Sequence, residues 1–235
     1  MKIQLTTLCL TVAVLLGSVG VSWSADFQKG LTAAQSGDYA TALREWTPLA
    51  EQGSPDAQGN LGVLYVNGLG VPKDYVVASK WFTLAAKQGY ATAQYNLGRL
   101  HDEGHGVPKD YKTAIKWYTL AAKQGVASAQ NDLGWLHHNG LGTAQNYEIA
   151  VKWYTHAAEH RHKSAIFNLG IMFKKGQGVP QNYIRAHMWW NIAAELGNEE
   201  AFTKLYELEK EMTPSQIETA QKLASECVRK KYKGC

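Results

Sequence analysis

Long runs of basic residues are missing from this 235-residue sequence. The formal net charge is only +4, and the first run of three consecutive Lys and Arg residues is Arg229–Lys231. A nucleic-acid-binding protein needs a clustered basic face, so the sequence predicts no nucleic-acid partner. Charged residues make up 19% of the chain and aromatic residues 11%, a composition that is typical of a folded protein rather than a disordered one.

Catalytic motifs are missing as well. The sequence contains no nucleophile elbow, no phosphate-binding glycine loop followed by lysine, and no cysteine–histidine pair oriented by a third group. We therefore predict that the protein is not an enzyme and that it carries no cofactor.

Apolar segments long enough to cross a membrane are missing too. The apolar run Leu8–Leu16 is far shorter than the roughly 20 residues that a bilayer requires. It follows the basic Lys2 and precedes Ser22-Trp23-Ser24, which places small side chains at both critical positions of a signal-peptidase site. Residues 1–24 are therefore predicted to be a cleaved signal peptide. The mature protein is expected to be periplasmic or secreted, without a membrane span, and monomeric.

Cysteine is scarce. Only Cys227 and Cys235 follow the predicted signal peptide. An exported compartment permits oxidation, and two cysteines this close in sequence can form a small disulfide loop. The alternative is a pair of free thiols, with Cys227 buried on a helix face.

Metal-ligand patterns are weak. All eight histidines lie between His101 and His187, but no acidic residue or cysteine completes a tetrahedral set with them at a useful spacing. His101 and His137 occupy the repeat position of Tyr65, which marks them as half-buried aromatic substitutes. We predict no metal site.

Internal repetition, by contrast, dominates the sequence. A Leu-Gly pair, a Gly-x-Gly loop, a tryptophan and an Ala-Ala pair each recur four times at steps of 36 residues. Four copies in step, without insertions, indicate units that bury their apolar faces against one another. The Leu-Gly pairs begin at Leu61, Leu97, Leu133 and Leu169, and the tryptophans are Trp81, Trp117, Trp153 and Trp189.

Each unit is predicted to contain two helices. In the first unit, apolar residues at three- and four-residue spacings predict a helix over about 56–67, and a second helix is expected over about 75–87. Gly68 and Gly70 should end the first helix, because glycine accepts the positive φ of helix C-termini. Asp74 is placed to cap the second helix.

Two positions in each unit give expectations about packing. Gly62 lies in the middle of a helix, where glycine is unfavourable, and this indicates close approach by the backbone of a neighbouring helix. The second helix is expected to bury both Trp81 and Phe82. The position of Leu84, which is occupied by His156 in the third unit, is also expected to face the core.

The two ends of the array differ from its middle, as terminal units should. Residues 25–55 are predicted to form an N-terminal capping helix pair, residues 56–198 the four repeats, and residues 199–235 the C-terminal capping helices. Thr213-Pro214 followed by Gln216 predicts a capping box at the start of the last helix.

The pattern Ala-x-x-x-Leu-Gly-x-x-Tyr, Gly-x-Gly-Val-x-x-Asp-Tyr, Ala-x-x-Trp-Tyr-x-x-Ala-Ala-x-x-Gly resembles the Sel-one-like repeat family, a relative of the tetratricopeptide repeats. Residues 93–125 match it nearly position for position. The chain departs from the pattern at Arg161, where the closing glycine is expected, and at Thr143-Ala144, which replace Val-Pro. The resemblance implies an all-α fold, a right-handed α-solenoid of helix-turn-helix repeats whose first helices line the concave face.

Residues on that concave face change from unit to unit while their neighbours repeat. They include aromatic residues and an arginine, the usual anchors of protein interfaces. We predict that a protein partner binds there, although tolerant surface positions would vary in the same way. The predicted interface residues are Tyr95, Arg99, Asp102, Trp135, His138, Phe167, Ile171 and Lys174.

The resemblance implies an adaptor or regulatory role, such as scaffolding an envelope complex or restraining a membrane sensor. The alternative is an enzyme or ligand-binding protein that acts on cell-wall material, in the manner of a β-lactamase or a peptidoglycan-related protein. Family members linked to that chemistry are rich in cysteine, with each repeat stapled, and this chain lacks such pairs.

Overall fold

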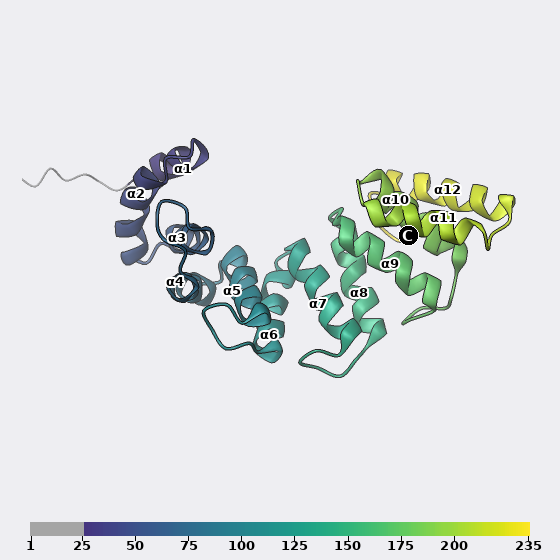
Figure 1. Cartoon of the computed structure of the whole chain (residues 1–235), viewed down its shortest axis with the longest axis horizontal. Coiled ribbons are helices and arrows are strands. Elements are labelled where there is room, and N and C mark those ends of the chain that lie inside the picture. The colour runs from purple at the N-terminus through teal and green to yellow at the C-terminus, as the bar shows by residue number, and fades with distance from the viewer. Residues whose placement is uncertain (1–25) are drawn as a thin grey trace, which may run out of the picture.

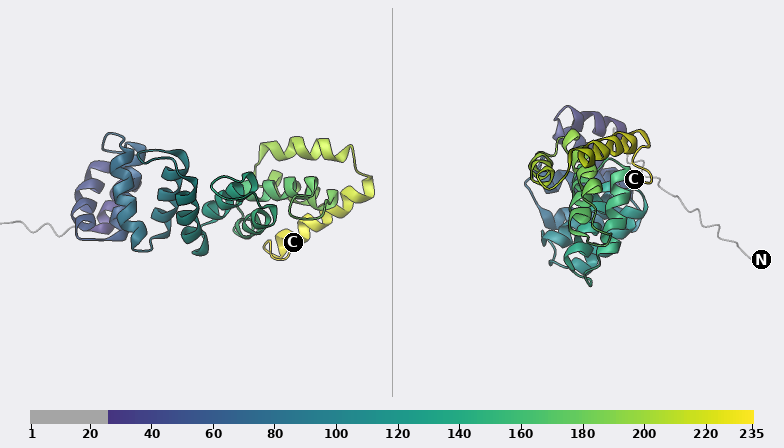
Figure 2. Two further views of the ribbon diagram at one scale, coloured as in Figure 1. Left: turned by 90° about the horizontal axis from the view of Figure 1, so that it is seen from below. Right: turned by 90° about the vertical axis from the view of Figure 1, so that its right-hand side faces the viewer.

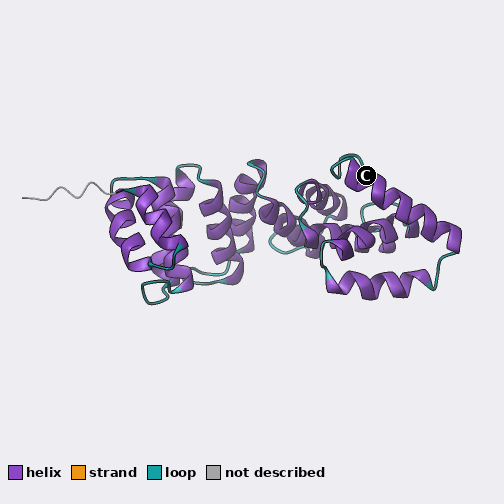
Figure 3. Cartoon of the chain, turned by 90° about the horizontal axis from the view of Figure 1, so that it is seen from above, coloured by secondary structure: helices purple, strands orange, loops and turns teal. Residues whose placement is uncertain are grey.

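The computed structural model describes residues 26–235, and these residues form helices and loops without any strand (Figure 3). The predicted signal peptide, residues 1–24, lies outside the described residues. The twelve helices are α1 (Phe27–Gln35), α2 (Tyr39–Glu51), α3 (Pro55–Asn67), α4 (Tyr75–Lys87), α5 (Ala91–Glu103), α6 (Tyr111–Lys123), α7 (Ala127–Asn139), α8 (Tyr147–Glu159), α9 (Lys163–Lys175), α10 (Tyr183–Glu195), α11 (Glu199–Glu209) and α12 (Pro214–Arg229).

The helices follow one another along an arc, with each of α1 to α10 packed against the next and α12 packed against α10 (Figure 1). First helices of neighbouring units also touch, since α3 contacts α5 and α7 contacts α9. First helices that meet across units lie on the inner side of a curved stack. The expected all-α solenoid is confirmed. Within residues 26–235, no helix is long and apolar enough to span a membrane.

The glycine in the middle of each first helix makes room for an aromatic ring of the second helix. A Cβ atom on Gly98 would lie 2.7 Å from the Tyr118 ring, and one on Gly134 would lie 2.7 Å from the Tyr154 ring. Real Cβ atoms essentially never come this close to other atoms. The expected close approach is therefore present, but it is made by a side chain and not by a helix backbone.

The repeated tryptophan is not the residue that fills the core of each unit. Tyr118 and Tyr154, the residues that follow two of these tryptophans, are completely buried, whereas Trp117 and Trp153 are half-buried. The expectation that the second helix buries both residues is wrong for the tryptophan in the first three units. Only in the fourth unit is the tryptophan, Trp189, buried as well.

The position of His156 was expected to face the core, and this expectation is also wrong. Its equivalents Leu84 and Leu120 are 46% and 44% exposed, and they lie on the outer surface of the second helices. Buried small residues such as Ala85 and Ala86 take the core-facing side of the same turn.

Helix ends follow the local sequence closely. The Asp74 side chain accepts hydrogen bonds from the backbone of Val76 and Val77, which confirms the predicted cap of α4. Gly68 adopts a left-handed conformation at the end of α3. The capping box of Thr213 and Gln216 is present at the start of α12.

The C-terminal segment is tied to the last helix by a disulfide bond. Cys227, near the end of α12, is bonded to Cys235, with 5.6 Å between their Cα atoms. The Arg185 guanidinium donates a hydrogen bond to the Cys235 carbonyl oxygen, so the chain end is also fastened to α10.

A hydrogen bond between two glutamines, with a buried acceptor and an exposed donor, joins the two helices of each of the first two units. The Nε2 group of Gln88 donates to the amide oxygen of Gln58 at 2.8 Å, and Gln124 donates to Gln94 at the same distance. In the third unit His160 takes the place of the donor. The Gln130 amide oxygen is therefore buried without a hydrogen-bond partner.

Replacing His160 with glutamine is expected to raise the free energy of unfolding by about 1 kcal/mol, because a buried acceptor regains its donor. Urea unfolding followed by circular dichroism measures the change. Gln88→His is the matched control, since it creates the same defect in the first unit and should lower stability by about as much. Equal stability of His160→Gln and the parent protein, alongside a clear loss in Gln88→His, would contradict this account.

Candidate functional site: the inner face and its groove

One side of each first helix faces the inside of the arc. We call this surface the inner face and define it by the residues of α5, α7 and α9 that vary between units. Trp135 on α7 is its most exposed aromatic residue, with 43% of its surface accessible. Tyr95, Arg99, Asp102, His138, Ile171 and Lys174 are half-buried there.

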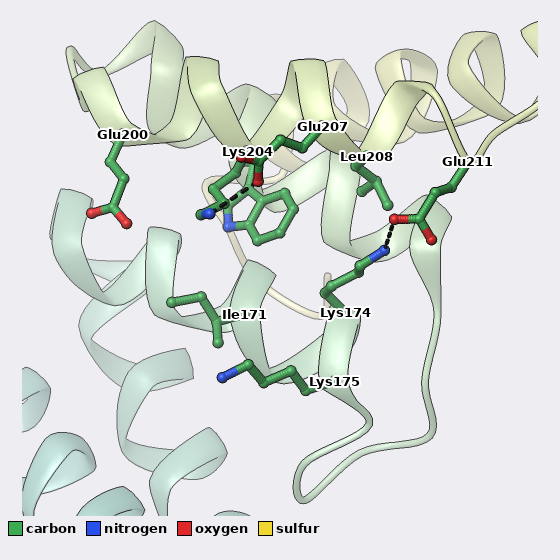
Figure 4. A pocket seen from close by; sticks show the side chains of 9 residues that line it. Ile171, Lys174, Lys175, Glu200, Lys204, Glu207, Leu208 and Glu211 are labelled. Carbon is green, nitrogen blue, oxygen red and sulfur yellow. Dashed lines mark hydrogen bonds and ion pairs between the residues drawn. The ribbon is translucent and has the colours of Figure 1, made fainter.

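A groove of about 370 Å³ opens between α9 and α11 at the C-terminal end of the inner face (Figure 4). Ile171 and Lys174 lie on its α9 side, and Ile171 occupies the repeat position of Trp135 one unit later. The inner groove is lined by Ile171, Lys174, Lys175, Trp190, Glu200, Lys204, Glu207, Leu208 and Glu211.

Both signs of charge border the inner groove. The Lys174 ammonium lies 2.6 Å from a Glu211 carboxylate oxygen and 4.0 Å from the centre of the Tyr183 ring. The hydrogen bond from Lys174 holds the pKa of Glu211 below its usual value. Lys204 pairs with Glu207 at 3.0 Å (Figure 4). These exposed pairs are individually weak, so a bound partner can replace them at little cost.

A cluster of tyrosines and carboxylates lies further along the inner face, between α5 and α7. The Tyr118 hydroxyl donates to Asp102 at 3.2 Å, and Tyr95 lies near Asp132. Burial raises the pKa of both carboxyl groups, and burial together with the nearby Asp132 raises the pKa of Tyr95 to about 12. The positive charge of Arg99 lowers the pKa of Asp132, against the effect of burial.

The inner face therefore offers aromatic, aliphatic and charged groups along one surface, which suits an extended or helical polypeptide. Within residues 26–235, no group of three or more His, Cys, Asp or Glu side chains is arranged to hold a metal ion.

Comparison with known proteins identifies the repeat. The Sel1 repeat model matches residues 55–90, 91–126, 127–162 and 163–198, which together make up more than half of the chain. The chain belongs to the Sel1 repeat family. Sel1 repeat proteins generally mediate protein–protein interactions and are typically non-catalytic.

Two solved structures of Sel1 repeat proteins share the fold with appreciable sequence identity. The Sel1 repeat protein of Oxalobacter formigenes is 37% identical, with a TM-score of 0.72 over 77% of this chain and 74% of its own. The protective antigen c5321 of uropathogenic Escherichia coli strains, which displays an SLR fold, is 34% identical, with a TM-score of 0.75 over 85% of this chain. The match spans 45% of that antigen, less than half of its length.

More distant structures share the fold alone. A putative Sel1 repeat protein of Klebsiella pneumoniae is 22% identical, with a TM-score of 0.51 over 77% of this chain and 89% of its own. No protein of curated function matches the sequence.

The Sel1 units bring most of the predicted interface residues together, with one exception. Phe167 is only 7% exposed, because its ring packs 6.2 Å from the Trp190 ring and its carbonyl oxygen accepts a hydrogen bond from the Trp190 indole. Phe167 therefore packs between α9 and α10 and is not accessible to a partner. His138 contacts the Tyr147 ring edge-on at 5.5 Å.

Sequence reasoning missed the α11 side of the inner groove and the buried carboxylate of the cluster. Asp132 replaces an asparagine that stands at the same position in the other three units, as Asn60, Asn96 and Asn168. Comparison of this position in the four units would have revealed that single departure from the repeat. Glu200, Lys204 and Glu211 follow the last repeat, outside the four units from which the interface was predicted.

Replacing Asp132 with asparagine is expected to stabilise the protein at pH 7. Burial raises the pKa of Asp132, so its carboxylate form opposes folding above that pKa and its protonated form does not. We expect a gain in the free energy of unfolding of about 1 kcal/mol at pH 7. The gain should disappear as the pH falls below the ordinary value of 3.8.

Urea titrations of both proteins between pH 3 and pH 7 measure this difference. Asn96→Asp is the matched control, because it places a carboxylate at the same position of the preceding unit. A stability difference that does not change with pH would show that the charge of Asp132 is not the cause.

Proposed function

We propose that this Sel1 repeat protein is exported and acts as an adaptor that binds a protein partner along the inner face, within an envelope complex or on a membrane sensor. The predicted signal peptide supports export, and so does the disulfide between Cys227 and Cys235, since such bonds persist in oxidising compartments.

The observation that carries the proposal is the exposed Trp135 on the inner face. The tryptophans of the second helices are buried or half-buried in the repeat packing, whereas Trp135 stands on a first helix and is 43% exposed. Ile171 occupies the position of Trp135 one unit later and lines the inner groove. Exposed tryptophans are characteristic of the energetic centres of protein interfaces, and so are arginines such as Arg99, which occupies the equivalent position one unit earlier.

A quantitative pull-down from envelope extracts tests the proposal. Trp135→Ala combined with Arg99→Ala should reduce the captured partner at least about tenfold, which is the loss expected from removing interface anchors. The control is Leu120→Ala combined with Lys116→Ala, two exposed positions on the outer surface of α6. This control should retain the partner.

Equal capture by both double variants would refute the assignment of the inner face. Retention of purified peptidoglycan by the parent protein, without any protein partner, would instead favour the role in cell-wall chemistry. Circular dichroism of each variant shows whether the solenoid is intact.

A further inference from the structure

The helix α11 exposes a face that the four preceding first helices bury. Phe202 and Tyr206 are 59% and 66% exposed, although they lie one helical turn apart on a helix of the repeat array. Their equivalents 36 residues earlier are Ile166 and Gly170, and both are buried, with Gly170 against the Trp190 ring of the second helix of its own unit.

This face of α11 is exposed because α11 lacks the glycine that the other first helices have at the position of Tyr206. In the four repeats, an aromatic ring of the second helix rests on the glycine of the first helix. Tyr206 occupies the glycine position in α11, so a following helix cannot pack there in the same way. The next helix, α12, packs against α10 instead, and α11 and α12 diverge on either side of it (Figure 2).

The uncovered face carries a simple charge pattern. Glu199, Phe202, Tyr206 and Lys210 follow one another at intervals of three or four residues, which places them along one stripe of the helix. We call this the α11 stripe. It points away from the inner groove, whose lining residues on α11 lie at other positions of the helix turn. The Lys210 ammonium lies over the Tyr206 ring, 4.0 Å from its centre.

We propose that the α11 stripe binds the same stripe of a second copy of this chain, in antiparallel orientation about a two-fold axis. The stripe has an acidic residue at one end, a basic residue at the other, and two aromatic residues between them. In the antiparallel pair, Phe202 packs against Tyr206 of the second copy, and Glu199 meets Lys210 of the second copy. Both contacts occur twice, so the surface is complementary to itself.

The size of the stripe sets the strength of this contact. One short helix on each side buries less surface than a standard stable interface, so the dimer should be weak and form only at high protein concentration. The inner faces of both copies remain open, because the stripe and the inner groove lie on different sides of α11. The inference therefore stands independently of the proposed partner on the inner face.

Sedimentation-velocity ultracentrifugation over about 5 to 500 µM, a range chosen for the weak contacts of small interfaces, tests the proposal. The parent protein should shift from monomer to dimer with concentration. Phe202→Ser combined with Tyr206→Ser should weaken dimerisation at least about tenfold, because the aromatic anchors are lost.

Charge reversal distinguishes the antiparallel pair from other contacts. Glu199→Lys alone and Lys210→Glu alone each place like charges opposite one another and should weaken the dimer. An equimolar mixture of the two variants pairs opposite charges at both ends and should recover it. Glu218→Lys, an exposed change on α12, is the control and should leave dimerisation unchanged.

A parent protein that stays monomeric over the whole range would overturn the proposal. So would a mixture that associates no better than either single variant, even if the parent dimerises. Circular dichroism of each variant separates weakened association from loss of helical structure.

Discussion

Replacing Tyr118 with alanine is expected to lower the free energy of unfolding by about 3 to 5 kcal/mol. The ring is completely buried and rests against Gly98, and its hydroxyl donates to Asp102. Truncation therefore removes the buried aromatic surface, leaves a cavity between α5 and α6, and deprives a half-buried carboxylate of its donor. Few other single changes in this chain combine these three losses.

Urea unfolding measures the total effect, and hydrogen exchange of the backbone amides locates it. In a repeat array each unit contacts only its neighbours, so protection should fall most in α5 and α6 and least in α1 and α12. Tyr118→Phe is the control, because it keeps the ring and removes only the hydrogen bond, at a cost of about 1 kcal/mol. Equal losses in both variants would show that the buried ring does not support the unit.

Replacing Gly134 with valine is expected to destabilise the protein by about 2 to 3 kcal/mol, although valine forms helices better than glycine does. Its Cβ atom alone would lie 2.7 Å from the Tyr154 ring, and that ring is buried and has no room to move away. The gain in helix propensity is well below 1 kcal/mol and cannot offset the overlap. The two helices of the third unit should separate slightly.

Thermal and urea unfolding measure this change. Trp135→Val is the control, because it introduces the same side chain at the next position of α7, which is exposed to solvent. It should alter stability far less than Gly134→Val. A second test combines Gly134→Val with Tyr154→Ala, and this pair should cost less than the sum of the two single changes, since the smaller side chain leaves room for valine. Simple additivity would contradict steric overlap as the cause.

Helix positions were predicted well because their signals are local. The second helix of the first unit was expected over about 75–87 and is found at Tyr75–Lys87. Asp74 and Gly68 mark such boundaries through their own side-chain and backbone chemistry. These boundaries therefore do not depend on contacts between residues distant in sequence. The repeat then extends a correct assignment in one unit to the other three.

The candidate site was predicted only in part. The inner-face positions of α5 and α7 were found because the repeat separates variable from constant residues. The second wall of the inner groove was missed because it belongs to α11, which the turn after α10 brings beside α9. Phe167 was expected on the surface because its position varies between units. A buried position can vary as well, since Phe167 packs against Trp190, which replaces the smaller rings of Tyr118 and Tyr154.

The sequence by itself determined the 36-residue register, the all-α class, the helix ends and the family, since all of these are written in spacing and in local chemistry. Only the tertiary structure decided which of two adjacent aromatic residues fills the core of each unit, because neighbours on a helix differ by about 100° and periodicity alone cannot choose between them. It also decided the place of α12. Tyr206 blocks the usual packing site, and the best remaining apolar surface belongs to α10, which depends on contacts between distant parts of the chain.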